Sequence, residues 1–483
     1  MGILKKLASE TAVYGLSSIV GRFLNYLLVP FYTAVFLPEQ YGVITEVYSY
    51  AAFLNVVFIY GMETTYFRQC NKVGVDKEKV FLKIQSLVII TTFVLCSLMM
   101  LLSNQIADIL KYPENGNLII LLAAILGFDA VLAIPFARLR QEGKAKKFAF
   151  VKILNILLNV GLNILFLVIL PEISGDHNPN VDLVLIANLF ANAVQIFFFI
   201  EYFTLWKAAT LDWHTVKLYL GYGLPIMVMG FAGMINEVVD RIALKFLLPA
   251  NFYPGKSQLA AVGIYGACYK LSIFMSLGIQ AFRYASEPFF FSKAQDKNSP
   301  EMYAKIMHWF VLCCVAVLLL ISFNLDWIQY LLRNEEYREG LVVVPVLLAA
   351  NLCLGIYYNL SIWYKLTDRT QIGMLISLAG ALVTIVLNVL LVPAIGYLGS
   401  AWATLVCYGF MTATSYFIGQ KSYFVPYNSF YLITCVFLAA IISITYWNYS
   451  FNENQIFNIV FKNMASIALM GILFLFGKKI KAL

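Results

Sequence analysis

The sequence predicts an all-α integral membrane protein with about fourteen transmembrane helices, and two observations support this fold class. Hydrophobic residues make up 61% of the 483 residues and charged residues only 12%, whereas soluble domains carry about 25% charged residues. Apolar runs that approach or exceed the roughly 20 residues of a spanning helix recur along the whole chain. Because so few charges could not cover a water-exposed surface, we expect no large soluble domain.

The predicted spans follow one another from one end of the chain to the other, separated by polar breaks. They cover residues 12–37, 42–67, 84–103, 117–137, 153–170, 181–206, 219–248, 259–290, 306–331, 341–364, 371–391, 400–419, 429–449 and 456–477. The first run is too long for the apolar part of a signal peptide, so we expect it to be retained. The eight cysteines have no metal-binding spacing and fit small apolar core residues better than a disulfide framework.

Lysine and arginine are distributed unevenly between the two sides of the predicted membrane domain. Of the 34 basic residues, 24 fall in loops on the side of the N-terminus and 4 in loops on the other side. The positive-inside rule therefore places both termini in the cytoplasm. The consistent alternation also supports an even number of helices.

Short segments of the first half recur in the same order in the second half. "GLSSIV" from residue 15 matches "GLPIMV" from residue 223, "PEQYGVITEVYSYAAFL" from 38 matches "LAAVGIYGACYKLSIFM" from 259, and "LNILFLVILP" from 162 matches "LNVLLVPAIG" from 387. We therefore predict two pseudo-symmetric six-helix bundles, 1–210 and 211–425, followed by an extra helix pair, 426–483. Such repeats are typical of secondary transporters, which bind substrate between them.

Three stretches also resemble a known family. "ETAVYGLSSIVGRFLNYLLVPFYTAVFLPEQYGVITEVYSY", "LAAVGIYGACYKLSIFMSLGIQAFRYASEPFFF" and "TQIGMLISLAGALVTIVLNVLLVPAIGYLGSAWATLVCYG" are similar to the polysaccharide transporter branch of the multidrug/oligosaccharidyl-lipid/polysaccharide flippase superfamily. The resemblance runs from about residue 8 to 475. It implies two helical bundles that form a V around a central cavity and work by alternating access.

The resemblance also implies a function and partners. It indicates a flippase for O-antigen (lipopolysaccharide) or capsule repeat units, which moves undecaprenyl-diphosphate-linked oligosaccharide from the cytoplasmic to the outer leaflet of the bacterial inner membrane. The expected partners are this glycolipid, the lipid bilayer, and a polymerase and glycosyltransferases of the same pathway. No nucleic acid partner is expected.

Six basic residues fall inside the predicted spans: Arg22, Arg241, Lys245, Lys270, Arg283 and Lys462. A cation at the bilayer centre costs roughly 2.5–3.5 kcal/mol on insertion scales and should face a cavity or a partner. The resemblance implies one diphosphate-binding cation in helix 1 and one in helix 8, at the positions of Arg22 and Lys270, and Arg241 is a third candidate. A lysine at the second position lacks the bidentate fork of arginine. Alternatively, Arg22 pairs with Glu46 or Glu63.

The segment "INEVVDRIALK" is the densest charged patch within a span. Glu237 and Arg241 are four residues apart and are expected to pair, which leaves Asp240 without a local partner. The resemblance implies a coupling site for Na⁺ or H⁺ from Asp240, Glu237, Thr384, Asn388 and Thr404, and no other cofactor. The alternative is that the patch is solvated charge at the outer mouth.

Polar stripes mark two neighbouring spans. Asn155, Asn159 and Asn163 follow Lys152 on one helix face, and Asn188 and Asn192 share a face of the next span. Together with Glu46 and Glu63 they are candidate polar groups of a cavity wall that binds sugar hydroxyls. Amides at such positions can equally bond helix to helix.

The leading interpretation is a transporter and not an enzyme, because a membrane glycosyltransferase, polymerase or ligase generally needs a sizeable loop domain that we do not find. No metal site or catalytic residue is predicted. Two alternatives remain open: a cation-coupled multidrug extruder of the same superfamily, and a non-transporting scaffold of a glycan assembly complex.

Overall fold

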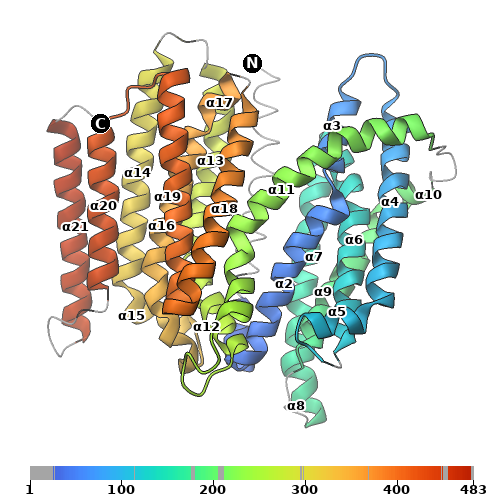
Figure 1. Cartoon of the computed structure of the whole chain (residues 1–483), viewed down its shortest axis with the longest axis horizontal. Helices are drawn as coiled ribbons and strands as arrows, with labels where there is room; N and C mark the ends of the chain where they lie inside the picture. The colour runs from blue at the N-terminus through green and yellow to red at the C-terminus, as the bar shows by residue number, and fades with distance from the viewer. Residues whose placement is uncertain are drawn as a thin grey trace. The chain divides into compact units, whose positions relative to one another are not determined.

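The computed structural model describes residues 26, 28–113, 115–175, 180–204, 211–293, 296, 298–367, 369–447, 449 and 455–479. These residues are mostly helical and include no β-strand, which confirms the all-α fold class (Figure 1). The chain divides into two compact units. Unit 1 comprises 1–28 and 43–238, and unit 2 comprises 29–42 and 239–483. The bundle limits predicted at 210/211 and 425/426 remain predictions.

The helices of unit 1 cover its described part with short connections. They are α2 (Pro38–Ile59, whose first residues belong to unit 2), α3 (Met62–Cys70), α4 (Lys77–Leu101), α5 (Ser103–Ile109), α6 (Gly116–Gln141), α7 (Ala145–Ile164), a π-helical turn (Leu165–Ile169), α8 (Leu170–Ser174), α9 (Asp182–Gln195), a 3₁₀ turn (Ile196–Phe199), α10 (Ile200–Thr204) and α11 (Trp213–Leu247, which continues into unit 2).

Helix α6 forms the centre of unit 1. It packs against α4, α9 and α7, and α7 in turn packs against α9. Leu126, Ile134 and Phe136 of α6 are buried, as is Val184 of α9. Asp76 caps the N-terminus of α4: its carboxylate accepts hydrogen bonds from the backbone amides of Glu78 and Lys79. A side-chain acceptor at this position satisfies free amides of the first turn.

Unit 2 contains the remaining helices. They are α12 (Gln258–Leu271), α13 (Ile273–Lys293), α14 (Ser299–Phe323), α15 (Leu325–Ile328), two 3₁₀ segments (Gln329–Leu331 and Glu335–Val342), α16 (Val343–Leu360), α17 (Ile362–Leu366), α18 (Thr370–Ile395), α19 (Tyr397–Ser422), α20 (Ser429–Tyr446) and α21 (Gln455–Lys479).

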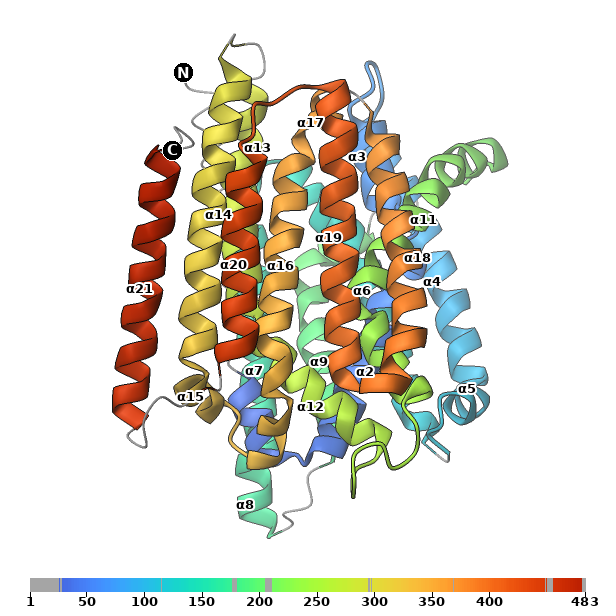
Figure 2. The ribbon, with the colours of Figure 1, turned by 60° about the vertical axis from the view of Figure 1, so that its left-hand side comes forward.

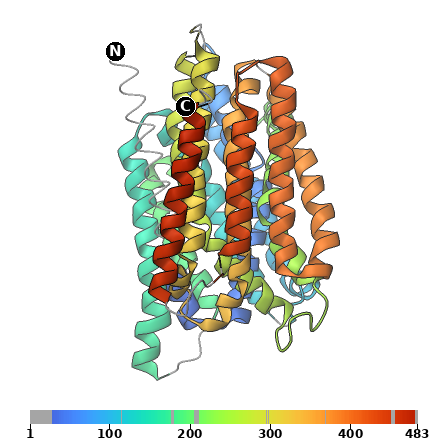
Figure 3. The same ribbon diagram turned by 90° about the vertical axis from the view of Figure 1, so that its left-hand side faces the viewer.

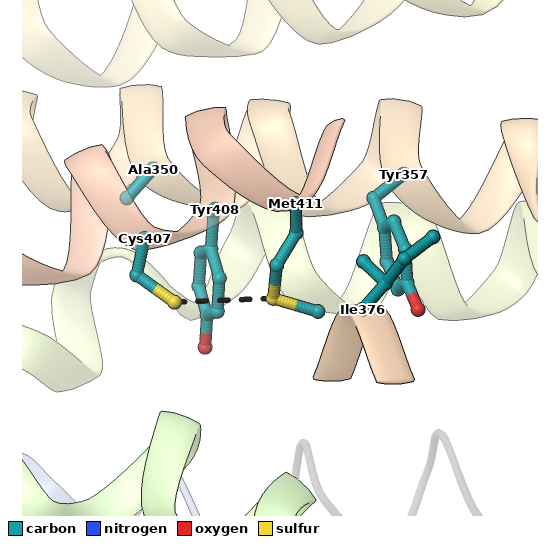
Figure 4. Packing of buried hydrophobic residues seen from close by; sticks show 6 residues of the cluster. All are labelled: Ala350, Tyr357, Ile376, Cys407, Tyr408 and Met411. Atoms are coloured by element: carbon teal, nitrogen blue, oxygen red, sulfur yellow. Dashed lines mark hydrogen bonds between the residues drawn. The ribbon is translucent and has the colours of Figure 1, made fainter. Parts of the chain in front are cut away.

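Helix α16 is the most buried long helix of unit 2 and packs against both α14 and α19 (Figure 2). Ala350 and Tyr357 of α16 meet Ile376 of α18 and the Cys407–Met411 turn of α19 in one apolar cluster (Figure 4). The last two helices, α20 and α21, pack against α14 and lie at its side (Figure 3). Many of their side chains are large, apolar and exposed, as lipid-facing helices require.

Eleven helices are long and apolar enough to span a membrane, or twelve if the bent pair 258–271 and 273–284 is one span. These counts refer only to the described residues. Helix α19 has 26 residues but is not among the eleven, and most of the first predicted span, 12–37, lies outside the description. Every other predicted span overlaps a helix or a broken helix, and the total of fourteen remains a prediction.

The internal repeat is visible as a symmetric contact within unit 2. Gly42 lies against the carbonyl oxygen of Leu259, and Gly263 lies against that of Pro38, so that a Cβ atom at either glycine would overlap the opposite backbone. Residues 38–42 and 259–263 are equivalent positions of the predicted repeat. The two copies of this segment thus cross through matching glycines.

Further contacts hold residues 29–42 in unit 2. The Tyr337 hydroxyl donates to the Phe36 carbonyl at 2.8 Å. The backbone amides of Arg333 and Asn334 donate to the hydroxyl and the carbonyl of Thr33, both at 3.2 Å. Unit 2 therefore includes a segment that is distant from it in the sequence.

Candidate functional site

A buried charged cluster lies in unit 2 where α11 faces α12. Asp240, Arg241 and Lys245 of α11 are only 3%, 7% and 4% exposed. A guanidinium nitrogen of Arg241 lies 3.3 Å from Oδ1 of Asp240, and the Tyr265 hydroxyl donates to Oδ2 at 2.6 Å. The guanidinium also lies over the Tyr269 ring, 4.2 Å from its centroid. A carboxylate and a guanidinium thus share one enclosed site.

This geometry corrects two predictions. Asp240, predicted to lack a local partner, has both Arg241 and Tyr265. The alternative of solvated charge does not hold for Asp240, Arg241 and Lys245, because these three side chains are at most 7% exposed. Glu237 lies one turn before Arg241 on α11 and is exposed; it belongs to unit 1.

The polar residues predicted on α18 (Thr384 and Asn388) and α19 (Thr404) lie close together, near the turn of α11 that contains Asp240. The Ser400 hydroxyl donates to Oδ1 of Asn388 at 2.9 Å, and the Asn388 amide donates to the Thr384 carbonyl at 2.8 Å. The Thr404 hydroxyl donates to the Ser400 carbonyl at 3.0 Å. All four side chains are at most 5% exposed.

Ser400 links this group to α11, since its hydroxyl lies 3.4 Å from the backbone carbonyl of Asp240. Sequence reasoning missed Ser400, although it lies one turn before Thr404 on the same helix. The Asp240 carboxylate itself is bonded by Arg241 and by Tyr265 of α12. Within the described ranges, no group of three or more His, Cys, Asp and Glu residues is placed to hold a metal ion.

A second polar network lies in unit 1, around Asp129 of α6. The Asn192 amide of α9 donates to Oδ1 of Asp129 at 2.9 Å, and Asn155 of α7 donates to Oδ1 of Asn192 at 2.9 Å. Asn188 donates to the Tyr48 hydroxyl, also at 2.9 Å. The predicted stripes thus meet through direct amide contacts between helices.

Asp129 and Lys152 were both missed as site residues. Asp129 lies midway along the 26-residue helix α6, and a lone carboxylate at the centre of an apolar span was a visible signal. Lys152 was counted with the loop cations, but α7 already begins at Ala145, which places Lys152 inside the span. Asn159 and Asn163 lie further along α7, and Asn163 is fully buried and donates to the Asn159 carbonyl at 2.7 Å.

The two predicted glutamates lie in different surroundings within unit 1. Glu46 is fully buried and accepts hydrogen bonds from the hydroxyls of Tyr50 and Tyr112. Glu63 forms an ion pair with Arg140, with 2.8 Å between the charged atoms, and both side chains are about one-third exposed.

Of the predicted diphosphate-binding residues, only two lie in the described ranges. Arg22 lies outside them. Lys270 is half-buried in the last turn of α12, next to the 47° bend that separates α12 from α13. Arg241 is held by Asp240, as described above.

The apolar helices define a multi-pass membrane protein, and solved structures show which fold it has. The chain is similar to "Lipid II flippase MurJ, inward closed conformation", with a TM-score of 0.71 at 14% identity over 98% of this chain and 99% of that chain. It is also similar to an inward-facing multidrug resistance transporter of the MATE family and MOP superfamily, with a TM-score of 0.60 at 13% identity over 82% and 93%. A MOP superfamily transporter from Pyrococcus furiosus gives 0.54 at 14% identity over 86% and 95%.

The family follows from the sequence itself. The family model described as "Polysaccharide biosynthesis protein" matches residues 7–293. The chain therefore belongs to the polysaccharide biosynthesis protein family, which confirms the resemblance found in the sequence. No curated protein sequence matches the chain.

Proposed function

We propose that this protein is a flippase that moves undecaprenyl-diphosphate-linked oligosaccharide from the cytoplasmic to the outer leaflet of the bacterial inner membrane by alternating access. We infer the class of the cargo from membership of the polysaccharide biosynthesis protein family. The likeness to the fold of a lipid II flippase over 98% of the chain supports the activity. The structures reported above are described as a flippase and transporters, so we propose no enzymatic activity.

The proposed cargo site takes the diphosphate on Arg22, Lys270 and Arg241, and the sugars on the amides of α7 and α9. Because Arg241 is already bound to Asp240, it would have to leave that carboxylate to reach a phosphate. The hydrogen bonds among Asn155, Asn188 and Asn192 would likewise have to open for sugar hydroxyls. In both exchanges the donors of Arg241 and of the amides pass from one polar partner to another, and the Asp240 carboxylate is left with Tyr265.

We further propose that Asp240, Thr384, Asn388, Thr404 and Glu237 couple transport to Na⁺ or H⁺. The burial of Asp240 supports this role, since an ionisable group inside a membrane is costly and commonly functional. Release of Arg241 from Asp240 would free the carboxylate for the cation.

The decisive experiment is to measure undecaprenyl-diphosphate-linked oligosaccharide in the inner leaflet of cells depleted of the protein, with or without the Arg22→Ala variant. We expect the intermediate to accumulate in depleted cells. We also expect it to accumulate in depleted cells that express the folded Arg22→Ala variant, because this variant does not restore export. Normal export from Arg22→Ala would remove that residue from the cargo site.

The second candidate is a cation-coupled multidrug extruder, which the MATE-like fold favours. The same experiment separates the two. A changed drug sensitivity without accumulation of the glycolipid would favour the extruder. A protein that acts only as a scaffold for a polymerase and glycosyltransferases would change neither the leaflet distribution nor drug sensitivity.

A further inference from the structure

Lys152 of unit 1 places a cation inside a membrane span without a polar partner. It lies seven residues after Ala145, about 10 Å along α7, and is half-buried. Its ammonium lies over the Phe136 ring, 4.1 Å from the centroid. Among the residues that the structure describes, no carboxylate lies within 4 Å of it and no acceptor bonds it.

Neighbouring cations of unit 1 differ in this respect. Arg138 forms an ion pair with Glu142 at 2.7 Å, Arg140 pairs with Glu63 at 2.8 Å, and Lys147, on the same helix as Lys152, pairs with Glu201 at 2.8 Å. Lys152 therefore keeps all three N–H donors available. A half-buried positive charge with free donors favours an anionic ligand, because burying an ammonium without a hydrogen-bond acceptor costs free energy.

The charges around Lys152 act on it at longer range. Asp129 and Glu63 attract its ammonium and Arg140 repels it. One oxygen of Asp129 already accepts from Asn192, and the other has no bonded partner in the described part of the chain. Asp129 is thus near enough to attract the ammonium but does not bind it directly.

We infer that Lys152 is a further cation of unit 1 that holds a phosphate of the cargo, and that Asp129 attracts the same ammonium when the site is empty. The identity of the phosphate as part of a lipid-linked diphosphate rests on the proposed function. Phosphate oxygens replace the distant carboxylate as the partner of the ammonium. Asn155, one turn along α7, is the nearest amide on that face to support the ligand.

A lysine is suited to this task because its ammonium is a compact charge on a flexible stem, which can follow a phosphate through several orientations. The alternative is that Lys152 only stabilises the fold through the Phe136 ring. The two interpretations differ in what an added or removed charge does to ligand binding.

The test uses the purified full-length protein in detergent and undecaprenyl diphosphate as the probe, with binding followed by native mass spectrometry. Lys152→Gln should weaken binding about tenfold to a hundredfold, as expected from the loss of one charge-assisted hydrogen bond, and Lys152→Arg should restore most of it. Asp129→Asn should tighten binding, because the competing carboxylate is gone. Lys147→Gln, a matched change on α7, should bind like the wild type.

Two further ligands identify what Lys152 recognises. Undecaprenol, which lacks phosphate, should bind all variants equally. If the phosphate alone is recognised, the affinities of the variants for inorganic pyrophosphate should rank as they do for undecaprenyl diphosphate. If the lipid must be attached, the variants should not differ in their affinity for pyrophosphate. Equal binding of undecaprenyl diphosphate to Lys152→Gln and Lys147→Gln would overturn the inference. If Lys152→Gln does not fold, Asp129→Asn decides: tighter binding supports the inference, and unchanged or weaker binding overturns it.

The outcome is separable from that of the proposed function. If depleted cells accumulate the glycolipid but Lys152→Gln binds undecaprenyl diphosphate normally, the flippase stands and this inference fails. If no glycolipid accumulates but binding depends on Lys152, the phosphate site stands and the cargo is a different phosphorylated lipid.

Discussion

At the scale of single residues, the two carboxylates Asp240 and Asp129 inside the spans are stabilised by polar neighbours, some of them from other helices. Asp240 is bonded by Arg241 beside it and by Tyr265 of α12. Asp129 is bonded by Asn192 of α9. A buried charge without such partners would cost several kcal/mol, and these contacts offset part of that cost. Each can be tested by removing one donor.

The Tyr265 hydroxyl is the first such donor. Tyr265→Phe removes the hydrogen bond to Oδ2 of Asp240 and leaves a buried carboxylate oxygen less satisfied, which should lower stability by about 1–3 kcal/mol. The melting temperature of the purified protein measures this. Tyr330→Phe, at a position 53% exposed, is the control and should be neutral. Equal melting temperatures for the two variants would mean that Asp240 does not need this donor.

Asp212 gives a prediction about pH. The hydrogen bond from Lys83, followed by those from the Thr215 hydroxyl and backbone amide, holds the pKa of Asp212 below its ordinary value. Its stabilising contribution is therefore complete above about pH 4, the ordinary pKa of aspartate, and is lost as the pH falls through the lower folded-state pKa. The melting-temperature difference between the wild type and Asp212→Asn should be constant from pH 8 to 5 and should shrink below pH 4. A difference that grows on acidification would contradict this.

At the scale of secondary structure elements, the crossing of α2 and α12 shows how a sequence repeat becomes a packing contact. The start of each helix provides one glycine: Gly42 lies against the carbonyl of Leu259, and Gly263 lies against the carbonyl of Pro38 in the other copy of the repeat. Small residues allow helix backbones to approach closely in membranes. The repeat therefore preserves a residue size at this place and not merely a hydrophobic pattern.

Both glycines should be intolerant of a side chain. Gly42→Ala and Gly263→Ala each place a Cβ atom against backbone, and overpacking of this kind costs about 1–3 kcal/mol. Thermal unfolding of the purified variants measures the loss. Gly161→Ala on α7, where no atom lies within 4 Å of the added Cβ, is the control and should be neutral or stabilising. If all three variants melt together, the crossing is not a close contact.

At the scale of the whole molecule, the charge distribution predicts how the protein is oriented in the membrane. With Lys152 assigned to its span, the predicted loops hold 23 basic residues on one side and 4 on the other, so the orientation has a strong bias. The exposed loop residues Val73 and Pro254 lie in loops of opposite predicted side. They allow the orientation to be tested directly.

Val73→Cys should react with a membrane-impermeant thiol reagent only when the cytoplasmic side is open, as in inverted vesicles. Pro254→Cys should react in intact spheroplasts. The wild type, whose Cys313 is exposed on a helix, gives the background labelling to subtract. Labelling of Val73→Cys in spheroplasts would reverse the predicted orientation.

Coupling is the second prediction for the whole molecule. Asp240→Asn keeps the size of the side chain but removes its charge, so transport by this variant in proteoliposomes should no longer respond to pH or Na⁺. Ser400→Ala, which removes the hydroxyl between Asn388 and Asp240, should weaken the response without abolishing it. An unchanged response in Asp240→Asn would assign coupling to other residues.

The sequence by itself determined the fold class, the membrane location of most helices, the internal repeat and the family, because hydrophobic runs, loop charges and motifs are local properties of the chain. It also identified Asn155, Asn188 and Asn192, whose helical spacing places them on common faces. Only the tertiary structure decided the partners: Arg241 and Tyr265 on Asp240, Ser400 between α11 and α18, and Asp129 within the amide network. A contact between helices depends on which faces meet, and an enclosed charge depends on what covers it. Lys152 shows the difference most clearly, since its lack of a partner is a property of the packed helices around it and not of the residues beside it in the chain.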